Sequence, residues 1–380
     1  MRGRSLRLRR QPRRAQRAKS PGTPAIMDIF DDPQFLDLSE RARSIFARAG
    51  AESFFSLPEW YDLVAREGLA PPWRPQLYLS DNAGLVACAS AKAKGAPREL
   101  QGCSNIYAVE YSVVAPDSGA ETKKNVRDLI AELARTKPCP DTILLPGLDP
   151  KGPGFAGVLA GLRDGGFVAK PYFSWSIWFE PTRGCDFASY LAARPSALKN
   201  TWRRKLASVE KLQRVAFRTS GELDVERFIA LYDQVYSRSW KTPEPFPGFM
   251  PGLLRMAAQK QALRFGVLEI EGTPAAAQFW IVWDDRAIIF KLAYDEKWTK
   301  LSPGTLLTMH MIRHVLEHDH PQEINFGRGD DDYKKLWMSA RRERWGIEAA
   351  NLRTRHGIGR SLRLSAGMLR DRLTGRGLSV

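Results

Sequence analysis

The chain of 380 residues lacks the features that mark several classes of protein. It has four cysteines, Cys88, Cys103, Cys139 and Cys185, and no pair of them has the C-x-x-C spacing of a zinc or redox motif. This scarcity excludes a disulfide scaffold and favours a reduced compartment such as the cytoplasm. No run of about 18 apolar residues is present, so we expect no segment to span a membrane.

Acidic residues are nearly absent from both ends of the chain, which explains most of its net charge of +16. The first 25 residues hold nine Lys and Arg and no acid, and the last 30 hold seven Arg and one Asp. About +1 is left for the body, so we expect no specific nucleic-acid partner. Residues 1–26 are expected to be a basic disordered extension, or to precede a true start at Met27. The basic tail, residues 353–380, either is disordered or makes peripheral contact with an anionic membrane as an amphipathic helix.

The pattern of apolar residues between these ends predicts two α/β units, at residues 27–182 and 183–352. Each unit has the order hairpin, central strand, helix, strand, helix and final strand, so the expected fold class is α/β with a mixed sheet. Helices are expected at residues 30–49, 60–67, 121–136, 155–164, 195–212, 225–240 and 252–261, from 303, and at 330–337. Strands are expected at residues 73–80, 85–92, 105–114, 141–145, 168–180, 214–219, 263–271, 274–283, 287–294, 323–326 and 344–352.

The second unit carries the clearest functional signal. The predicted strand over residues 287–294 is followed by a polar turn and by Ser302, Pro303, Gly304 and Thr305. Ser302 suits a helix cap, and Pro303 suits the first helical position, where its missing N–H costs nothing. Gly304 and Thr305 would then point free N–H groups outward from a positive helix end, which is a site for phosphate or another anion.

Six short runs of the second unit are distinctive in combination. They are AAAQFW at 275–280, KLAYD at 291–295, LSPGTLL at 301–307, GDDDYK at 329–334, WMS at 337–339 and RRERWGI at 341–347. Together they resemble the GNAT acyl-CoA N-acyltransferases, and more narrowly the bacterial CelD-like acetyltransferases linked to cellulose and exopolysaccharide production. The first unit matches in layout only. A tandem GNAT-like arrangement of this kind is also similar to the Fem-type peptidoglycan aminoacyltransferases.

The resemblance implies an acetyl-CoA site in the second unit and no metal. The pantetheine arm would pair with the strand backbone, and the pyrophosphate would lie on N–H groups at the start of the helix. The usual GNAT loop, aligned on Gly304, has Gln or Arg in place of Thr299 and Gly in place of Ser302, so the identity of the acyl carrier is left open. The residues assigned to the cofactor are Lys291, Ala293, Tyr294, Leu301, Ser302, Gly304, Thr305 and Leu306.

Transfer to an amine needs a proton acceptor, because an amine with a pKa of about 10.4 is almost fully protonated at pH 7. Asp295, directly after the strand, is the expected base, with a turn residue that binds only backbone as the alternative. Tyr333 occupies the place where GNAT enzymes often keep a tyrosine that protonates the leaving thiolate. The alternative for Tyr333 is a packing role.

Five further residues are candidates for the acceptor site, each with a structural alternative. Gln278 is polar in an apolar strand and must find a partner, in a cleft or within the fold. Trp240 and Lys241 precede a Pro-rich loop of the kind that forms lids, or they belong to a helix core. Asp331 could contact substrate or favour a helix start, and Lys334 could bind an anionic acceptor or pair with a neighbouring acid.

The expected function is acyl transfer from acetyl-CoA to an amine of a small molecule or saccharide, by direct attack, in the cytoplasm. Two alternatives stay open. One is a Fem-type aminoacyl-tRNA-dependent transferase, and the other is a non-catalytic GNAT-like protein that binds a regulatory ligand. His310, His314 and His318 have helical spacing, but no carboxylate or cysteine completes a zinc site, so no metal is expected.

Overall fold

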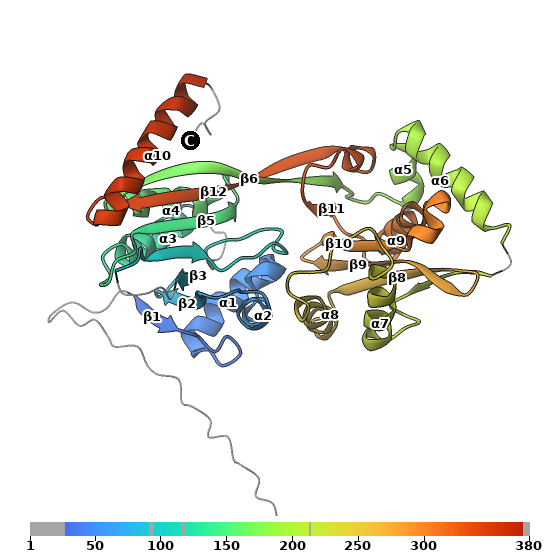
Figure 1. The fold of residues 1–380 in the computed structure, drawn as a ribbon, viewed down its shortest axis with the longest axis horizontal. Coiled ribbons are helices and arrows are strands. Elements are labelled where there is room, and N and C mark those ends of the chain that lie inside the picture. Colours follow the sequence, from blue (N-terminus) through green and yellow to red (C-terminus); the bar gives the residue numbers. More distant parts are fainter. Residues whose placement is uncertain (1–26, 91–94, 116–118, 213, 375–380) are drawn as a thin grey trace, which may run out of the picture.

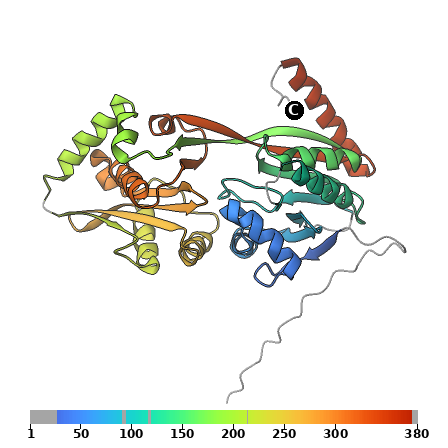
Figure 2. The ribbon, with the colours of Figure 1, turned by 180° about the vertical axis from the view of Figure 1, so that it is seen from behind.

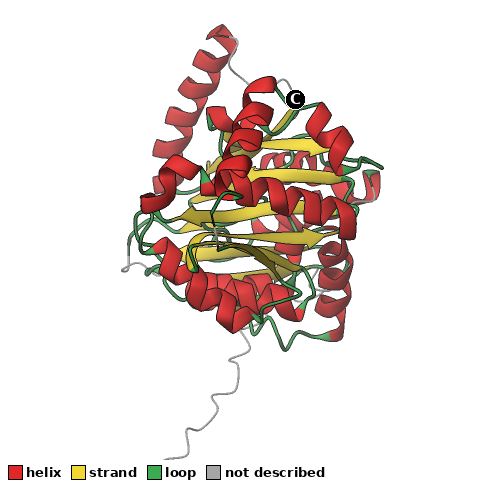
Figure 3. Ribbon diagram, turned by 90° about the vertical axis from the view of Figure 1, so that its right-hand side faces the viewer, coloured by secondary structure: helices red, strands yellow, loops and turns green. Residues whose placement is uncertain are grey.

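One continuous mixed sheet of twelve strands forms the centre of the molecule, and helices cover both of its faces (Figures 1 and 3). The structure, a computed structural model, describes residues 27–90, 95–115, 119–212 and 214–374. The predicted α/β fold class with a mixed sheet is confirmed. The predicted basic extension, residues 1–26, lies outside the described residues.

The first half of the chain places its helices after recognisable start signals. Ser39 caps the first long helix by accepting the N–H of Ala42 at 3.4 Å, and Pro58 begins the second. The elements are β1 (Asp28–Asp31), α1 (Glu40–Glu52), η1 (Phe54–Ser56), α2 (Pro58–Glu67), β2 (Trp73–Leu79), β3 (Gly84–Ser90), β4 (Glu99–Gly102), α3 (Ala120–Leu133), β5 (Thr142–Leu148), α4 (Pro153–Asp164) and β6 (Phe167–Pro181).

The second half repeats this order after two additional helices. Asp224 caps the helix that follows the first strand, by accepting the N–H of Arg227 at 2.8 Å. The elements are α5 (Phe187–Ala192), α6 (Ser196–Val209), β7 (Val215–Thr219), α7 (Val225–Tyr236), α8 (Phe249–Gln259), β8 (Leu263–Ile270), β9 (Thr273–Trp283), β10 (Arg286–Tyr294), η2 (Glu296–Leu301), α9 (Pro303–His318), β11 (Glu323–Arg328), η3 (Asp332–Leu336), β12 (Ala340–Asn351) and α10 (Arg355–Thr374).

The last strand of each half crosses into the other half. β6 pairs with β11 of the second half, β12 pairs with β5 of the first, and β6 and β12 pair with each other. The order in the sheet is β1-β2-β3-β4-β5-β12-β6-β11-β10-β9-β8-β7. Figure 2 shows the two long strands running between the halves. The halves are therefore parts of one sheet.

An apolar core shared by both halves holds them together on one face of this sheet. It combines α1 and α2 with α7 and α8. The rings of Trp60 and Phe249 have centroids 5.6 Å apart, and those of Phe54 and Trp283 are 5.9 Å apart. Large aromatic side chains bury much apolar area, so this core fixes the halves relative to each other. A site can consequently take residues from both.

Residues 105–114, predicted as a strand, are irregular, so that prediction is wrong. Among the described residues they form one isolated bridge, from Val114 to Gly84, and the strand at this place in the sheet is β4. Tyr107 and Tyr111 are nevertheless buried. The apolar pattern therefore indicated that the segment is buried, and not that it is a strand. An irregular segment can also be buried when its backbone groups find hydrogen-bond partners.

Other predicted elements need smaller corrections. The first 10 residues of the helix predicted at 30–49 are not helical, because β1 ends and Ser39 starts the helix only at Glu40. The helix predicted at 330–337 is the short 3₁₀ turn η3. Residues 359–373, for which the sequence left helix and disorder open, belong to α10.

Candidate active site

The parallel strands β10 and β11 come apart within the sheet. They pair only over residues 286–288 and 323–325. Beyond that point β11 follows β6, where Arg328 lies opposite Ile177. Among the described residues, no strand pairs with residues 290–294 of β10 on this side. Their backbone forms an open edge, to which an extended ligand can hydrogen-bond as an added strand would.

A β-bulge at Phe290 sets the direction of the side chains along this edge. Leu292 and Tyr294 pack in the apolar cluster on the α9 face of the sheet. Lys291 points to the opposite face, where its Nζ lies 2.7 Å from the Glu244 carboxylate. The open edge therefore has a helix start on one face and a polar cluster on the other.

The first turn of α9 lies against β10. Pro303 occupies the first helical position, as predicted, but Ser302 is left-handed (φ 52°, ψ 54°) and its side chain makes no capping hydrogen bond. A Cβ on Gly304 would lie 3.2 Å from side-chain atoms of both Leu292 and Tyr294, so a larger residue would crowd the strand. Within the described residues, the N–H groups of Gly304 and Thr305 therefore have no side-chain acceptor at the positive end of the helix.

The residues assigned to the cofactor follow the open edge and the start of α9. Two of them have N–H groups that already donate within the chain: Ser302 to the Thr299 carbonyl at 3.0 Å and Leu306 to the Ser302 carbonyl at 3.2 Å. Lys291, Ala293 and Tyr294 belong to the open edge of β10, Leu301 ends η2, and Ser302, Gly304 and Thr305 form the helix start.

Three lysines lie on or beside the turn that leads into α9. Lys297 and Lys300 are exposed residues of η2. Lys205, from the basic helix α6, contacts the carbonyl oxygen of Lys300. Clustered positive charge of this kind attracts anions such as a pyrophosphate.

A cluster around Glu244 occupies the other face of the open edge. Glu244 belongs to the Pro-rich loop between α7 and α8. Its carboxylate accepts hydrogen bonds from Lys291 Nζ at 2.7 Å, Tyr107 Oη at 2.7 Å and Tyr236 Oη at 3.0 Å. Burial by itself would raise the pKa of Glu244, but these donors hold it below its usual value. Nothing in the sequence singled out Glu244 except its position between two prolines.

Lys241 lies in the same cluster, over the rings of Tyr236 and Trp240 at 6.0 and 5.7 Å. Burial, and then the charge of Lys291, lower the pKa of Lys241 to about 8. Its amine is therefore partly neutral near physiological pH, which suits a group that accepts a proton.

Lys241→Met is expected to raise the free energy of unfolding at pH 7. The folded state holds the Lys241 charge at a cost below pH 8, and this cost fades as the pH rises from about 8 toward the ordinary lysine value of 10.5. The gain should therefore shrink over that range, as measured by urea unfolding at a series of pH values. A gain that is the same at every pH would mean that packing, and not charge, explains it.

The two predicted proton-handling residues follow the two strands that part. Asp295, after β10, is 6% exposed, accepts the N–H of Lys297 at 2.9 Å and lies 3.7 Å from the Arg238 guanidinium. The Asp295 carboxylate thus also binds the backbone of its own turn, which was the alternative role expected for it. Tyr333, after β11, is 56% exposed. Partial desolvation and the Asp331 carboxylate raise the pKa of Tyr333 to about 12, so its hydroxyl carries a proton at neutral pH.

The predicted acceptor residues are not all on one surface. Gln278 is buried in β9 and donates to Thr308 Oγ1 of α9 at 3.2 Å. Trp240 is 50% exposed, and its ring centroid lies 4.3 Å from that of Tyr294 on the open edge. Trp240 and Lys241 lie at the open edge of β10, whereas Gln278 lies opposite Leu292 on the side of β10 that pairs with β9.

Lys334 and Asp331 lie at the turn after β11. Lys334 is 4% exposed and donates to the Arg328 carbonyl at 2.6 Å. It also forms an ion pair with Asp331 at 3.2 Å. The ammonium of Lys334 is thus engaged within the protein and stabilises this turn.

The irregular residues 105–114 form a wall of the site, a role that was not predicted for them. Besides the bond from Tyr107 to Glu244, the Val109 carbonyl accepts from Trp175 Nε1 at 2.8 Å, and the Asn105 carbonyl accepts from Arg328 at 3.2 Å. The first half thereby contributes directly to the polar cluster beside β10.

Residues 105–114 also fill the gap between the parallel strands β4 and β5, which correspond in the first half to β10 and β11. There β4 and β5 also pair over only three residues each, at 99–101 and 142–144. Beyond the pairing, the Tyr111 N–H donates to the Gly147 carbonyl at 3.2 Å, and a Cβ on Gly102 would lie 2.8 Å from the Tyr111 ring. In the first half, the gap between β4 and β5 is thus filled by residues 105–114, whereas the equivalent gap beside β10 in the second half is open.

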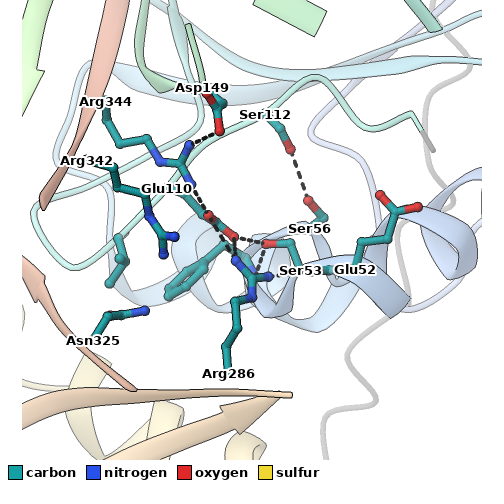
Figure 4. A network of polar contacts seen from close by, with 12 residues as sticks. Glu52, Ser53, Ser56, Glu110, Ser112, Asp149, Arg286, Asn325, Arg342 and Arg344 are labelled. Atoms are coloured by element: carbon teal, nitrogen blue, oxygen red, sulfur yellow. Dashed lines mark hydrogen bonds and ion pairs between the residues drawn. The ribbon is translucent and has the colours of Figure 1, made fainter. Parts of the chain in front are cut away.

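A buried network around Glu110 fixes this segment in position (Figure 4). Glu110 accepts from Ser53 Oγ at 2.6 Å, from Arg344 of β12 at 2.8 Å and from Arg286 of β10 at 3.4 Å. Burial opposes its charge, but Arg286 and Arg344 lower the pKa of Glu110 to about 2. The network borders a cavity of about 420 Å³ and joins both halves.

The part of the chain that the structure describes contains no group of three His, Cys, Asp or Glu residues that could hold a metal. His310 stacks on Phe217 at 4.4 Å, and His314 stacks on His318 at 4.3 Å. Burial lowers the pKa of His310 and of His314, so both favour the neutral form. The histidine stripe therefore packs as ordinary helix surface.

Comparisons with known proteins concern the second half of the chain and the overall fold. Residues 196–335 match the family described as "Acetyltransferase (GNAT) domain". The whole fold is similar to FemX (TM-score 0.61, 10% identity, 83% of this chain and 97% of that one). It is also similar to a conserved protein of unknown function from Bacteroides thetaiotaomicron (0.51, 14%, 84% and 98%). A third similar fold is the C-terminal domain of a protein assigned as lysylphosphatidylglycerol synthetase from Agrobacterium fabrum (0.50, 13%, 87% and 95%). No curated protein sequence matches the chain significantly.

Proposed function

We propose that this acyltransferase, whose residues 196–335 form a GNAT domain, transfers an acetyl group from acetyl-CoA to an amine at the open edge of β10. The observation that carries the proposal is the meeting of this edge with the uncapped start of α9. An acyl-CoA joins an extended arm containing amides to a pyrophosphate. The open edge of β10 can hydrogen-bond to the amides of the arm, and the helix start with its nearby lysines can bind the phosphates.

The acceptor amine would approach from the face of the sheet that carries Glu244. Its nitrogen attacks the thioester carbonyl carbon, the C–S bond then breaks, the nitrogen loses a proton and the thiolate gains one. The charge of Lys291 disfavours a protonated amine beside it, which lowers the cost of deprotonation. We assign the amine proton to Lys241, with Asp295 as the alternative acceptor, and the proton for the thiolate to Tyr333.

The resemblance to CelD-like enzymes supports a saccharide amine as the acceptor, in polysaccharide or cell-envelope synthesis. The free cysteines support a reaction in the cytoplasm. A panel of amino sugars and amino acids, scored by release of free CoA, tests the acceptor. Equal rates with all of these amines would argue against a dedicated saccharide site.

Thr305→Glu is expected to weaken acetyl-CoA binding at least about tenfold, a change of about 1.4 kcal/mol. Thr305 lies in the first turn of α9, where a carboxylate favours the helix but repels a pyrophosphate. Calorimetric titration measures the affinity, and the ligand-induced rise in melting temperature provides a second readout. Thr305→Gln, of the same length without the charge, should bind like the wild type. If no acyl-CoA binds the wild-type protein, the proposal fails.

A second candidate function is aminoacyl transfer from charged tRNA, as in Fem-type enzymes. The similarity in fold to FemX favours it, as do Thr299 and Ser302, which depart from the usual CoA loop. This function predicts turnover that depends on charged tRNA, with no stabilisation by acetyl-CoA. A non-catalytic GNAT-like protein would bind a ligand without turnover of either donor.

A further inference from the structure

The helix α10 is attached to the molecule by one of its faces only. Ser361 and Leu364 are 3% and 5% exposed and pack toward β12 and β6. Asp371 forms an ion pair with Lys170 of β6 at 2.6 Å, and Arg360 pairs with Glu348 of β12. In Figures 1 and 2 the helix projects from the outer edge of the first half. Its other faces are therefore presented to the surroundings.

One of these outer faces is a stripe of exposed apolar side chains. Ile358, Leu362, Leu369 and Leu373 are 47%, 69%, 61% and 80% exposed. At the α-helical rotation of about 100° per residue, they fall within an arc of about 60° and over a length of about 22 Å. Exposed leucines that share one helix face form a binding surface, unlike leucines scattered singly.

The next sector of the helix is basic. Arg363 and Arg370 are exposed there. Arg355, Arg360 and Arg363 also line a cavity of about 630 Å³ between α10 and the strands β4 and β5. The acids lining that cavity are Glu99 and Glu348, and Glu348 is paired with Arg360. The surface beside the apolar stripe therefore carries net positive charge.

We propose that α10 docks the protein on a bilayer with anionic headgroups, with the stripe in the interface and the arginines on the headgroups. An apolar face next to a basic face is the pattern of helices that lie in a membrane interface. A second copy of this chain would be a poorer occupant, because an isologous contact along the stripe would bring the arginines of both copies together. No helix in the described part of the chain is both long enough and apolar enough to cross a bilayer, so this contact is peripheral. The proposal is independent of the acyl-transfer reaction.

The test is sedimentation of the full chain with vesicles of phosphatidylcholine, with or without about a third of phosphatidylglycerol. The wild type should bind the anionic vesicles, and high salt should weaken this binding. The double variant Leu362→Ser and Leu369→Ser should bind at least about tenfold more weakly, because two exposed leucines no longer leave water. The double variant Arg363→Gln and Arg370→Gln should lose about fivefold for each arginine.

Matched controls separate α10 from the other basic and apolar parts of the chain. Leu36→Ser removes a leucine of similar exposure, 66%, far from α10 in sequence. Arg43→Gln with Arg48→Gln removes two exposed arginines of α1. Both controls should bind like the wild type. The proposal would be overturned if the α10 variants bound as strongly as the wild type, or if the wild type did not bind anionic vesicles. Self-association that only the leucine variant abolishes, without vesicle binding, would assign the stripe to a second copy instead.

Discussion

Replacing Glu244 by Gln is expected to lower turnover about 100-fold while leaving acetyl-CoA binding unchanged. The carboxylate holds Lys291, Tyr107 and Tyr236 together beside the open edge of β10. An uncharged amide cannot balance Lys291, so the proton-transfer geometry and the pKa of Lys241 both change. The measurement is release of free CoA with the fastest amine acceptor, across a series of pH values.

The two faces of β10 make this result informative. We place acetyl-CoA against α9 and the acceptor against Glu244, so the variant should keep its thermal stabilisation by acetyl-CoA and should shift its pH–rate profile. A merely structural role would lower stability without moving that profile. Glu222→Gln, which removes an exposed carboxylate 4.0 Å from Arg218, is the control and should keep wild-type turnover. Wild-type turnover by Glu244→Gln would remove Glu244 from the site.

Glu110→Gln is expected to lower the free energy of unfolding by about 3 kcal/mol at pH 7. The lowering of the Glu110 pKa from 4.5 to about 2 corresponds to this amount, at about 1.4 kcal/mol for each pH unit. The variant leaves Arg286 and Arg344 without the carboxylate between them, and a buried charge that loses its partner is strongly destabilising. Urea unfolding measures the difference.

The pH dependence of this loss follows from the sign of the shift. A carboxyl whose pKa is lowered by folding stabilises the protein above about pH 4.5, and this contribution is lost as the pH falls toward 2. The difference between wild type and variant should therefore shrink below pH 4.5. Glu226→Gln is the control: its exposed pair with Arg255 lies at 2.6 Å but should contribute little to stability, because solvent screens it. An equal loss in both variants would contradict the role of burial.

Residues close in sequence were enough to predict most helices and strands and the position of the turn that leads into α9. Pro303 begins α9 because its fixed φ and missing N–H suit that position whatever surrounds it. The hairpin of β8 and β9 follows from two apolar runs separated by a two-residue turn, Glu271 and Gly272, both with positive φ. These features depend on periodicity and backbone preference, which a single sequence carries.

The polar cluster beside β10 depends on contacts between distant parts of the chain. Glu244 meets Tyr107 across 137 residues and Lys291 across 47. The buried apolar side chains of residues 105–114 gave the pattern of a strand, although these residues fill the gap beside β5. Side-chain type does not tell an irregular buried segment from a strand, because both bury apolar groups.

The α/β class, the repeated order of elements and the helix start at Pro303 were therefore determined by local pattern. Three features were decided only when the halves packed together. They are the crossing of β6 and β12 into the opposite half, the position of residues 105–114 between β4 and β5, and the ion network at Glu110. Strand pairing and ion pairing join groups that are far apart in the chain, and their partners are chosen by the packing of the whole sheet. The helix start after β10 could thus be predicted, whereas the position of residues 105–114 beside it could not.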